Sequence, residues 1–289
     1  MHYDQEGFIE AADGTRLFFG LSGQGPRTLI LNDGVGCDGF VWRYLLPRLS
    51  QQYRLVHWHY RAHGRSGPSI DPDRLGIEDL ARDLHRLFEH LQLPRVGLLG
   101  HSMGTQVALE FYRQFPSAVD SLVLICGSFG RITETFHGSK ALAHLLPTLL
   151  EGARALPWAA RALWARLPSN LALKLAQTSG EIDPERFRQE DFARYWEHAS
   201  LMEPRVFLRM LELAGKHDAA DLLPHIDVPS LVLAGEHDTF TPMNLAEHMA
   251  ATIPAASFEV IEGASHAAPI EQPDRIAQAI EAFLTRTAH

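Results

Sequence analysis

Short apolar runs alternate with longer amphipathic segments along most of the chain. Short, mostly aliphatic runs occur at residues 96–99, 122–125 and 231–234. Residues 77–93, before the first of these runs, have leucines at helical spacing. Alternation of this kind is typical of a mostly parallel sheet, because parallel strands need crossover connections that are usually helical. The pattern therefore predicts an α/β fold with helices on both faces of the sheet.

The alternation is interrupted in two places. Asp13-Gly14, flanked by short apolar stretches, predicts a hairpin near the start of the chain. From about residue 131 to about 221 the strands stop, and the sequence becomes helical in character and rich in leucine and aromatic residues, with segments at 141–150, 153–167 and 192–214. We therefore expect an α/β core at residues 1–130 and 222–289, with a helical cap inserted at 131–221. Such a cap would enclose an apolar pocket over the strand ends.

Composition narrows the class of protein. A chain of 289 residues with 46% hydrophobic content can bury a full core, and its net charge of −9 with dispersed basic residues argues against a nucleic-acid partner. No apolar stretch is long enough to span a bilayer, and residues 1–6 lack the basic and apolar regions of a secretion signal. A cytoplasmic location is therefore expected. Nothing in the sequence indicates an oligomeric state.

Cysteine and histidine do not form a metal-binding pattern. Cys37 and Cys126 are too few for a disulfide framework, and we expect both to be small buried hydrophobic residues. Among the 16 histidines, His57 and His59 alternate along a strand, but no H-x-x-H cluster recurs. We expect neither a metal site nor a cofactor, and we expect His101 to pack or to form hydrogen bonds beneath the site described next.

One motif carries most of the chemical information. Gly100-His101-Ser102-Met103-Gly104 follows the apolar run 96–99 and opens a helix-like segment. A serine on a sharp strand-to-helix turn presents its hydroxyl, and glycines two residues before and after it remove side chains that would collide. The N–H of Met103 at the helix start would favour a developing oxyanion. The plainer alternative is a glycine-rich turn with an incidental serine.

A serine hydroxyl becomes a nucleophile only beside a base that is itself held by an acid. Asp238 follows the apolar strand 231–234, and His266 lies on a loop between the strand 258–261 and the last helix. Gly127-Ser128, after the strand 122–125, offers no carboxylate as an alternative acid. The sequence thus predicts a catalytic triad of Ser102, His266 and Asp238.

The order Ser102, Asp238, His266 resembles that of the α/β-hydrolase family, and the resemblance extends over nearly the whole chain. Residues 29–35 resemble the strand and loop that supply the first oxyanion-hole donor, here the backbone N–H of Val35, and residues 61–66 resemble the family's R-G-H-G-x-S turn. The resemblance implies a mostly parallel eight-stranded sheet flanked by helices with an inserted helical cap. It also implies serine hydrolysis without a cofactor, with Val35 and Met103 forming the oxyanion hole.

The chain departs from the family's pattern at several positions. Asp33 stands where the family usually has histidine, Ala62 replaces the first glycine of the turn, and Thr105 replaces a glycine often found after the serine motif. A carboxylate beside a developing oxyanion would be repulsive. We therefore expect Asp33 to point away and accept N–H groups of its own loop, or to be protonated.

The expected activity is hydrolysis of an ester or related acyl bond of a small apolar substrate through an acyl-enzyme, as in a carboxylesterase. The same residues would support hydrolysis of carbon-carbon, lactone or amide bonds, perhydrolysis or acyl transfer, and the fold does not separate these. A hypothesis of another class is a ligand-binding homologue whose pocket senses a small apolar molecule with only vestigial turnover.

Overall fold

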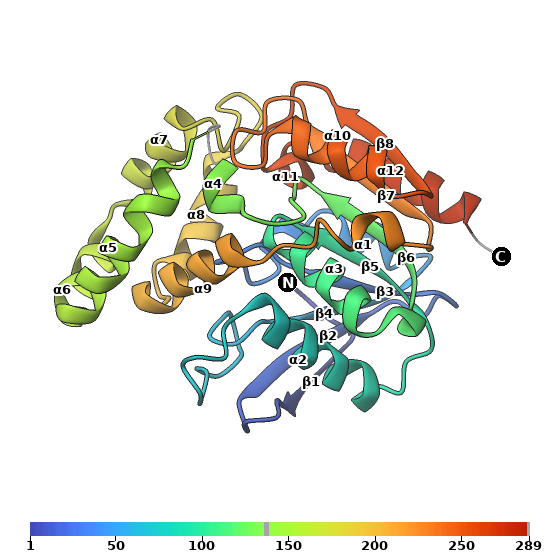
Figure 1. The fold of residues 1–289 in the computed structure, drawn as a ribbon, viewed down its shortest axis with the longest axis horizontal. Coiled ribbons are helices and arrows are strands. Elements are labelled where there is room, and N and C mark those ends of the chain that lie inside the picture. Colours follow the sequence, from blue (N-terminus) through green and yellow to red (C-terminus); the bar gives the residue numbers. More distant parts are fainter. Residues whose placement is uncertain (136–138, 288–289) are drawn as a thin grey trace.

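The strands of the computed structural model, which describes residues 1–135 and 139–287, form one sheet (Figure 1). Its order is β1-β2-β4-β3-β5-β6-β7-β8, with β1 and β2 antiparallel to their neighbours and the others parallel. The strands are β1 (Gln5–Glu10), β2 (Arg16–Ser22), β3 (Thr28–Asn32), β4 (Arg54–Trp58), β5 (Val96–His101), β6 (Val119–Ile125), β7 (Ser230–Gly235) and β8 (Ala256–Ile261). The predicted mostly parallel eight-stranded sheet and the opening hairpin at Asp13-Gly14 are confirmed.

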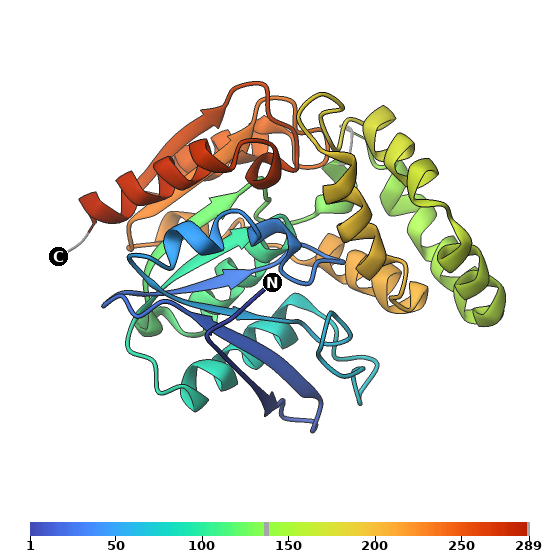
Figure 2. The same cartoon turned by 180° about the vertical axis from the view of Figure 1, so that it is seen from behind.

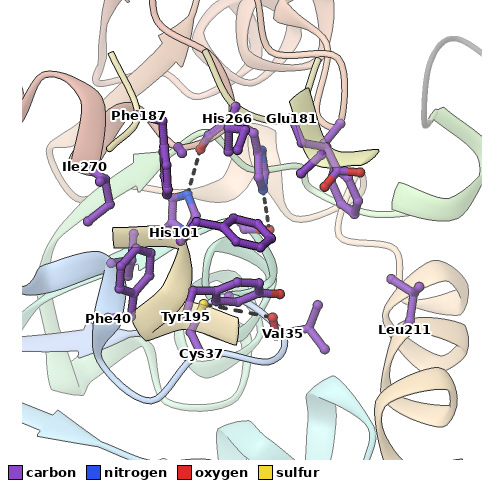
Figure 3. A pocket seen from close by; sticks show the side chains of 18 of the residues that line it. Val35, Cys37, Phe40, His101, Glu181, Phe187, Tyr195, Leu211, His266 and Ile270 are labelled. Atoms are coloured by element: carbon purple, nitrogen blue, oxygen red, sulfur yellow. Dashed lines mark hydrogen bonds between the residues drawn. The ribbon is translucent and has the colours of Figure 1, made fainter. Parts of the chain in front are cut away.

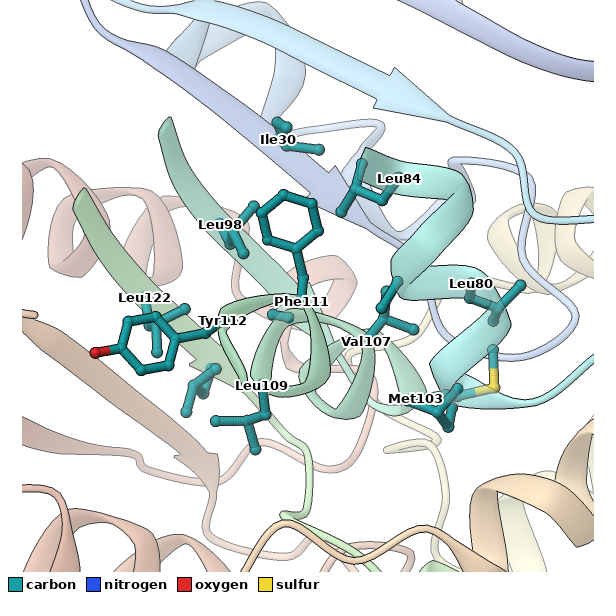
Figure 4. Packing of buried hydrophobic residues seen from close by; sticks show 14 of the residues in the cluster. Ile30, Leu80, Leu84, Leu98, Met103, Val107, Leu109, Phe111, Tyr112 and Leu122 are labelled. Atoms are coloured by element: carbon teal, nitrogen blue, oxygen red, sulfur yellow. The ribbon is translucent and has the colours of Figure 1, made fainter. Parts of the chain in front are cut away.

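The central strands are almost continuously apolar because both faces of the sheet are covered. In the register of the sheet, Ile30, Leu98 and Leu122 lie side by side and point to one face, and their chain neighbours point to the other. Figure 4 shows the first group packed against residues of two helices, among them Leu80, Leu84, Val107 and Phe111. The sheet thus separates two cores.

Helices cover both faces. The first face is covered by α2 (Ile77–His90), α3 (Met103–Gln114) and α10 (Met243–Thr252), and the second by α1 (Leu46–Leu49) and α12 (Pro273–Arg286). Shorter elements are η1 (Phe40–Trp42), η2 (Pro116–Ala118), η4 (Leu223–His225) and α11 (Ala268–Glu271). The helix predicted for residues 77–93 is present, but it ends at His90, since Gln92 takes a left-handed conformation with φ 48°.

A helical insertion separates β6 from β7. It consists of α4 (Ile132–Thr135), α5 (Ala141–Ala155), α6 (Pro157–Arg166), α7 (Ser169–Thr178), α8 (Gln189–Ala199) and α9 (Pro204–Lys216). The segment predicted at 192–214 is two helices, because Glu203 is extended and Pro204 starts a new helix. The helix α7 lies outside the predicted segments. Figures 1 and 2 show the insertion at one end of the molecule, opposite the C-terminal helix.

The parallel strands direct the candidate site residues to one edge. The carboxyl ends of β3, β5, β6, β7 and β8 point the same way, so the loops that follow them meet there. These loops contain Asp33, Ser102, Asp238 and His266. In the described part of the chain, no helix is both long and apolar enough to cross a membrane.

Candidate active site

Ser102 occupies a strained turn between β5 and α3. Its backbone angles are φ 55° and ψ −121°, outside the regions that non-glycine residues prefer. A side chain at Gly100 would collide with the backbone of Gly104, and one at Gly104 would collide with the backbone of Asn32 at the end of β3. The two glycines of the motif are therefore required by close backbone approach. The predicted strand, turn and helix around Ser102 are confirmed.

Thr105, which replaces a glycine of the family's pattern, is accommodated by another glycine. Its hydroxyl donates a hydrogen bond of 3.2 Å to the carbonyl oxygen of Gly100. A side chain at Gly127, after β6, would collide with the Thr105 side chain. The departure at Thr105 is thus compensated from the neighbouring strand, and the turn keeps its shape.

The structure brings together the three side chains predicted to form the triad. The Ser102 hydroxyl lies 2.9 Å from Nε2 of His266, and Nδ1 of His266 lies 2.9 Å from Oδ2 of Asp238. Asp238 is held by further donors, the backbone N–H groups of Phe240 at 2.9 Å and Thr241 at 2.8 Å and the Thr241 hydroxyl at 2.7 Å. The carboxylate is thereby fixed toward the imidazole.

The electrostatics of the pair suit proton transfer from serine. Burial favours the neutral form of both groups, but on balance the mutual attraction and the hydrogen bonds favour charge. As a result, the pKa of Asp238 is lowered from its ordinary value and the pKa of His266 is raised from its own. An ionised Asp238 accepts a hydrogen bond from the Nδ1–H group of His266, and this leaves the lone pair of Nε2 directed at Ser102.

His101, the residue before the serine, supports the loop of His266. Nε2 of His101 lies 2.9 Å from the carbonyl oxygen of His266, so this nitrogen carries the proton and donates it. Burial, with a smaller contribution from His266, lowers the pKa of His101 to about 4, so the ring is neutral at physiological pH. The expectation of a hydrogen-bonding role is confirmed, but the sequence did not reveal this partner.

The loop after β3 runs directly beside Ser102. A Cβ atom added at Gly34 would lie 3.2 Å from Cβ and 3.6 Å from Oγ of the serine. Val35 follows on this loop, and Met103 opens α3 on the other side of the serine. Within the described ranges, the backbone N–H of neither residue donates a hydrogen bond to the protein, which leaves both available to an oxyanion near Ser102.

Asp33 organises this loop from a buried position. Its Oδ2 accepts the backbone N–H of Gly39 at 2.8 Å and lies 2.9 Å from Nε2 of His57. The second ring nitrogen of His57 lies 2.6 Å from the hydroxyl of Tyr3. The Tyr60 hydroxyl also donates to the carbonyl oxygen of Asp33 at 2.8 Å. The expectation that Asp33 accepts an N–H of its own loop is confirmed, and His57 belongs to this network.

Comparison with known proteins agrees with the fold. The family model of the alpha/beta hydrolase fold matches residues 27–273. The chain belongs to the α/β-hydrolase family. A thermophilic esterase from Thermogutta terrifontis has a similar structure, with 27% sequence identity, a TM-score of 0.79, and coverage of 99% of this chain and 100% of the esterase.

Two other proteins resemble this α/β-hydrolase, one in structure and one in sequence. The enol-lactonase from Burkholderia xenovorans shares the fold, with 22% identity, a TM-score of 0.77, and coverage of 96% of this chain and 100% of the lactonase. An uncharacterized protein of Mycobacterium bovis is 27% identical over 289 residues, covering 95% of this chain and 80% of its own.

In this α/β-hydrolase a cavity of about 310 Å³ opens at Ser102 and His266 (Figure 3). Its wall is mostly apolar and comes from both the sheet side and the helical insertion. The sheet side contributes Val35, Cys37, Phe40, His101 and Ile270, and the insertion contributes Leu142, Ala176, Glu181, Phe187, Phe192, Tyr195, Phe207 and Leu211. The volume is at the lower end of the range for ligand sites. The leucine and aromatic residues of the insertion predict an apolar wall of this kind. The sequence does not distinguish the residues that line the cavity from those that pack within the protein.

The two cysteines behave as expected. Both are buried, and burial raises the pKa of each thiol, so neither is a thiolate at neutral pH. Cys37 contributes to the cavity wall, and Cys126 lies at the end of β6 against the loop of Ser265. They add apolar surface near the serine.

Proposed function

We propose that this α/β-hydrolase is a cofactor-independent serine hydrolase that cleaves an ester or related acyl bond of a small apolar substrate through an acyl-enzyme. The proposal rests on the hydrogen bonds that link Asp238 to His266 and His266 to Ser102, and on the apolar cavity that Ser102 faces. An activated hydroxyl in a largely apolar cavity suits attack on an uncharged acyl group.

In the first half of the reaction His266 acts as the general base. Its Nε2 accepts the proton of Ser102 as Oγ attacks the acyl carbon, and Asp238 stabilises the imidazolium that forms. The negative charge that develops on the acyl oxygen is stabilised by the backbone N–H groups of Val35 and Met103. His266 then gives the proton to the leaving group, and the acyl group stays on Ser102.

In the second half water replaces the leaving group. His266 accepts a proton from water as its oxygen attacks the acyl carbon, the same N–H groups stabilise the second oxyanion, and the proton returns to Ser102. Every proton transfer passes through Nε2 of His266, so the 2.9 Å contact between this nitrogen and Ser102 is the central geometric requirement.

The helical insertion would act as a cap, and we place the cap at residues 131–221. Its aromatic and aliphatic side chains close the cavity from the side opposite the sheet and limit the entry of water. Supporting this role, Tyr195 and Phe207 of the insertion lie against the oxyanion loop, within 3.4 Å of where a Cβ atom at Gly36 would be. A cytoplasmic location, and a small apolar ester-like molecule as the substrate, complete the proposal.

More than one type of bond is a candidate for cleavage. The esterase and the enol-lactonase share this fold, and the same triad would serve lactone, amide or carbon-carbon bonds. The esterase is the relative with the higher identity of the two, so we favour an ester. A ligand-binding homologue without turnover would not need the Asp238 carboxylate to be held by three donors in line with His266.

The chain-length dependence of ester hydrolysis tests this proposal. Each methylene that the cavity buries contributes about 0.8 kcal/mol, so kcat/KM for 4-nitrophenyl esters should rise from acetate and peak at roughly four to eight carbons. Longer chains should fail because the cavity is small. A steady decline from acetate would refute the apolar acyl site. Absence of ester hydrolysis by a protein whose serine reacts rapidly with a phosphonate would shift the assignment to another bond.

A further inference from the structure

Exposed apolar side chains concentrate on three consecutive helices of the insertion. We call α5, α6 and α7 with their connecting residues, 140–178, the outer helices. Trp158 and Leu163 are 74% and 76% exposed, and five leucines are about half exposed. Those leucines are Leu145, Leu149, Leu156, Leu171 and Leu175. In the rest of the described chain, large hydrophobic side chains with comparable exposure are scattered singly, as at Ile70.

The exposure follows the geometry of the helices. On α5, Leu146 and Leu150 are buried, while Leu145 and Leu149, one turn apart, point to solvent. On α7, the exposed Leu171 and Leu175 have the same spacing. The apolar side chains of each helix thus extend beyond the face that packs against the protein, and part of them is exposed to solvent. Figures 1 and 2 both show these helices at the outer edge of the molecule.

The same helices carry a charge opposite to that of the whole protein. Residues 140–178 contain five basic side chains and one acidic, Glu151, for a net charge of +4, and the full chain has −9. The rest of the protein therefore carries −13. All five basic residues are exposed, namely Lys140, Arg154, Arg161, Arg166 and Lys174. Two of them pair with carboxylates outside this range, Lys140 with Glu134 at 3.1 Å and Arg161 with Glu203 at 3.8 Å. Basic residues interspersed with exposed tryptophan and leucine are typical of helices that lie on anionic lipid surfaces.

We propose that the outer helices dock this protein on an anionic lipid surface. The leucine and tryptophan side chains enter the interface, and the arginine and lysine side chains contact the headgroups. A second copy of the chain fits the patch less well. A twofold dimer would place two positive patches against each other, and contact with the acidic remainder of another copy would be head-to-tail and open-ended.

Docking there would bring the cavity to the lipid. Leu142 of α5 and Ala176 of α7 line the cavity from the inner side of the same helices whose outer sides are apolar. The surface would thus collect apolar esters that partition into lipid. This last step rests on the proposed hydrolase function, whereas lipid docking itself does not.

Vesicle co-sedimentation with the full chain tests the docking. Binding to vesicles of mixed phosphatidylglycerol and phosphatidylcholine should exceed binding to phosphatidylcholine alone by at least tenfold, and should weaken with added salt. The triple variant Arg154→Gln, Arg166→Gln, Lys174→Gln should bind about 100-fold more weakly, at roughly fivefold per charge. The double variant Trp158→Ser, Leu163→Ser should lose at least about tenfold.

Matched controls lie on the core. Ile70→Ser removes a side chain that is 64% exposed, and Arg74→Gln removes an exposed charge, and neither should change vesicle binding. Equal binding to neutral and anionic vesicles, or no loss in the outer-helix variants, would overturn the proposal. So would a lipid-free dimer in sedimentation velocity that the Trp158→Ser, Leu163→Ser variant abolishes, since that result assigns the patch to a second copy.

The same preparations separate this proposal from the proposed function. None of the substituted residues lines the cavity, so hydrolysis of a soluble 4-nitrophenyl ester should stay unchanged in every variant. Vesicle binding by a protein that does not hydrolyse esters would refute the function alone. Ester hydrolysis by a protein that does not bind anionic vesicles would refute the docking alone.

Discussion

Asp33 allows the sharpest test of how the loop after β3 is built. Its carboxylate accepts the N–H of Gly39 and pairs with Nε2 of His57, and both contacts are buried. Asp33→Ala would leave two buried donors without a partner, at about 1–3 kcal/mol each, so the free energy of unfolding should fall by about 2–6 kcal/mol. Asp33→Asn, with its amide oxygen in the place of Oδ2, keeps an acceptor for both Gly39 and His57, and its amide nitrogen takes the place of Oδ1, which is buried without a partner. Its cost should be about 1–2 kcal/mol, with much of the rate retained.

Urea unfolding and kcat/KM for one ester, measured on both variants, distinguish the explanations. If the hydrogen bonds dominate, the asparagine variant lies close to the wild type and the alanine variant well below it. Equal destabilisation of the two would refute this account and point to the charge pair with His57 instead. A substantially faster Asp33→Asn variant would show that the carboxylate opposes the oxyanion, and the proposed role of the Val35 loop would be wrong.

Two further predictions concern the base and the backbone. His266 accepts a proton only when neutral, so kcat/KM should rise with pH through its pKa, which Asp238 raises from the ordinary 6.5 against the effect of burial. Asp238→Asn should lower the rate by roughly 10³–10⁴-fold and move this limb to lower pH, and a pH-independent rate from about 5 to 9 would contradict a histidine base. Ala62 has φ 58°, so Ala62→Gly should raise the free energy of unfolding by about 0.5–1 kcal/mol, whereas Ala282→Gly on α12 should lower it by about 1 kcal/mol. Equal effects in thermal or urea unfolding would argue against strain at Ala62.

The sheet and the triad could be predicted because they depend on local signals. The buried strands are apolar runs, and the turn at Ser102 is marked in the sequence itself by the glycines at 100 and 104 on either side of the serine. Once the strands are parallel, their carboxyl ends share one edge, so residues as distant as Asp238 and His266 must approach Ser102.

The parts that could not be predicted depend on tertiary contacts. The pairing of Asp33 with His57 arises because β3 and β4 are neighbours, and Tyr3 joins them from a segment near the chain start. The helix break before Pro204 is marked in the sequence only by that single proline, within a segment that otherwise has a helical pattern. The packing of α8 and α9 against the loop after β3 decides which aromatic residues of the insertion line the cavity. Periodicity alone does not contain that information.

Labelling with a fluorophosphonate probe tests the central claim most directly, since only an activated serine reacts quickly with it. The account predicts a single adduct, located by mass spectrometry on Ser102, and its complete loss in Ser102→Ala together with a fall in turnover on the order of 10⁴ to 10⁶. The variant should fold normally, because it loses one side-chain hydrogen bond, the one between Ser102 and His266, in the described part of the chain. An adduct on Ser128 or Ser265, or no adduct on the folded wild-type protein, would contradict it.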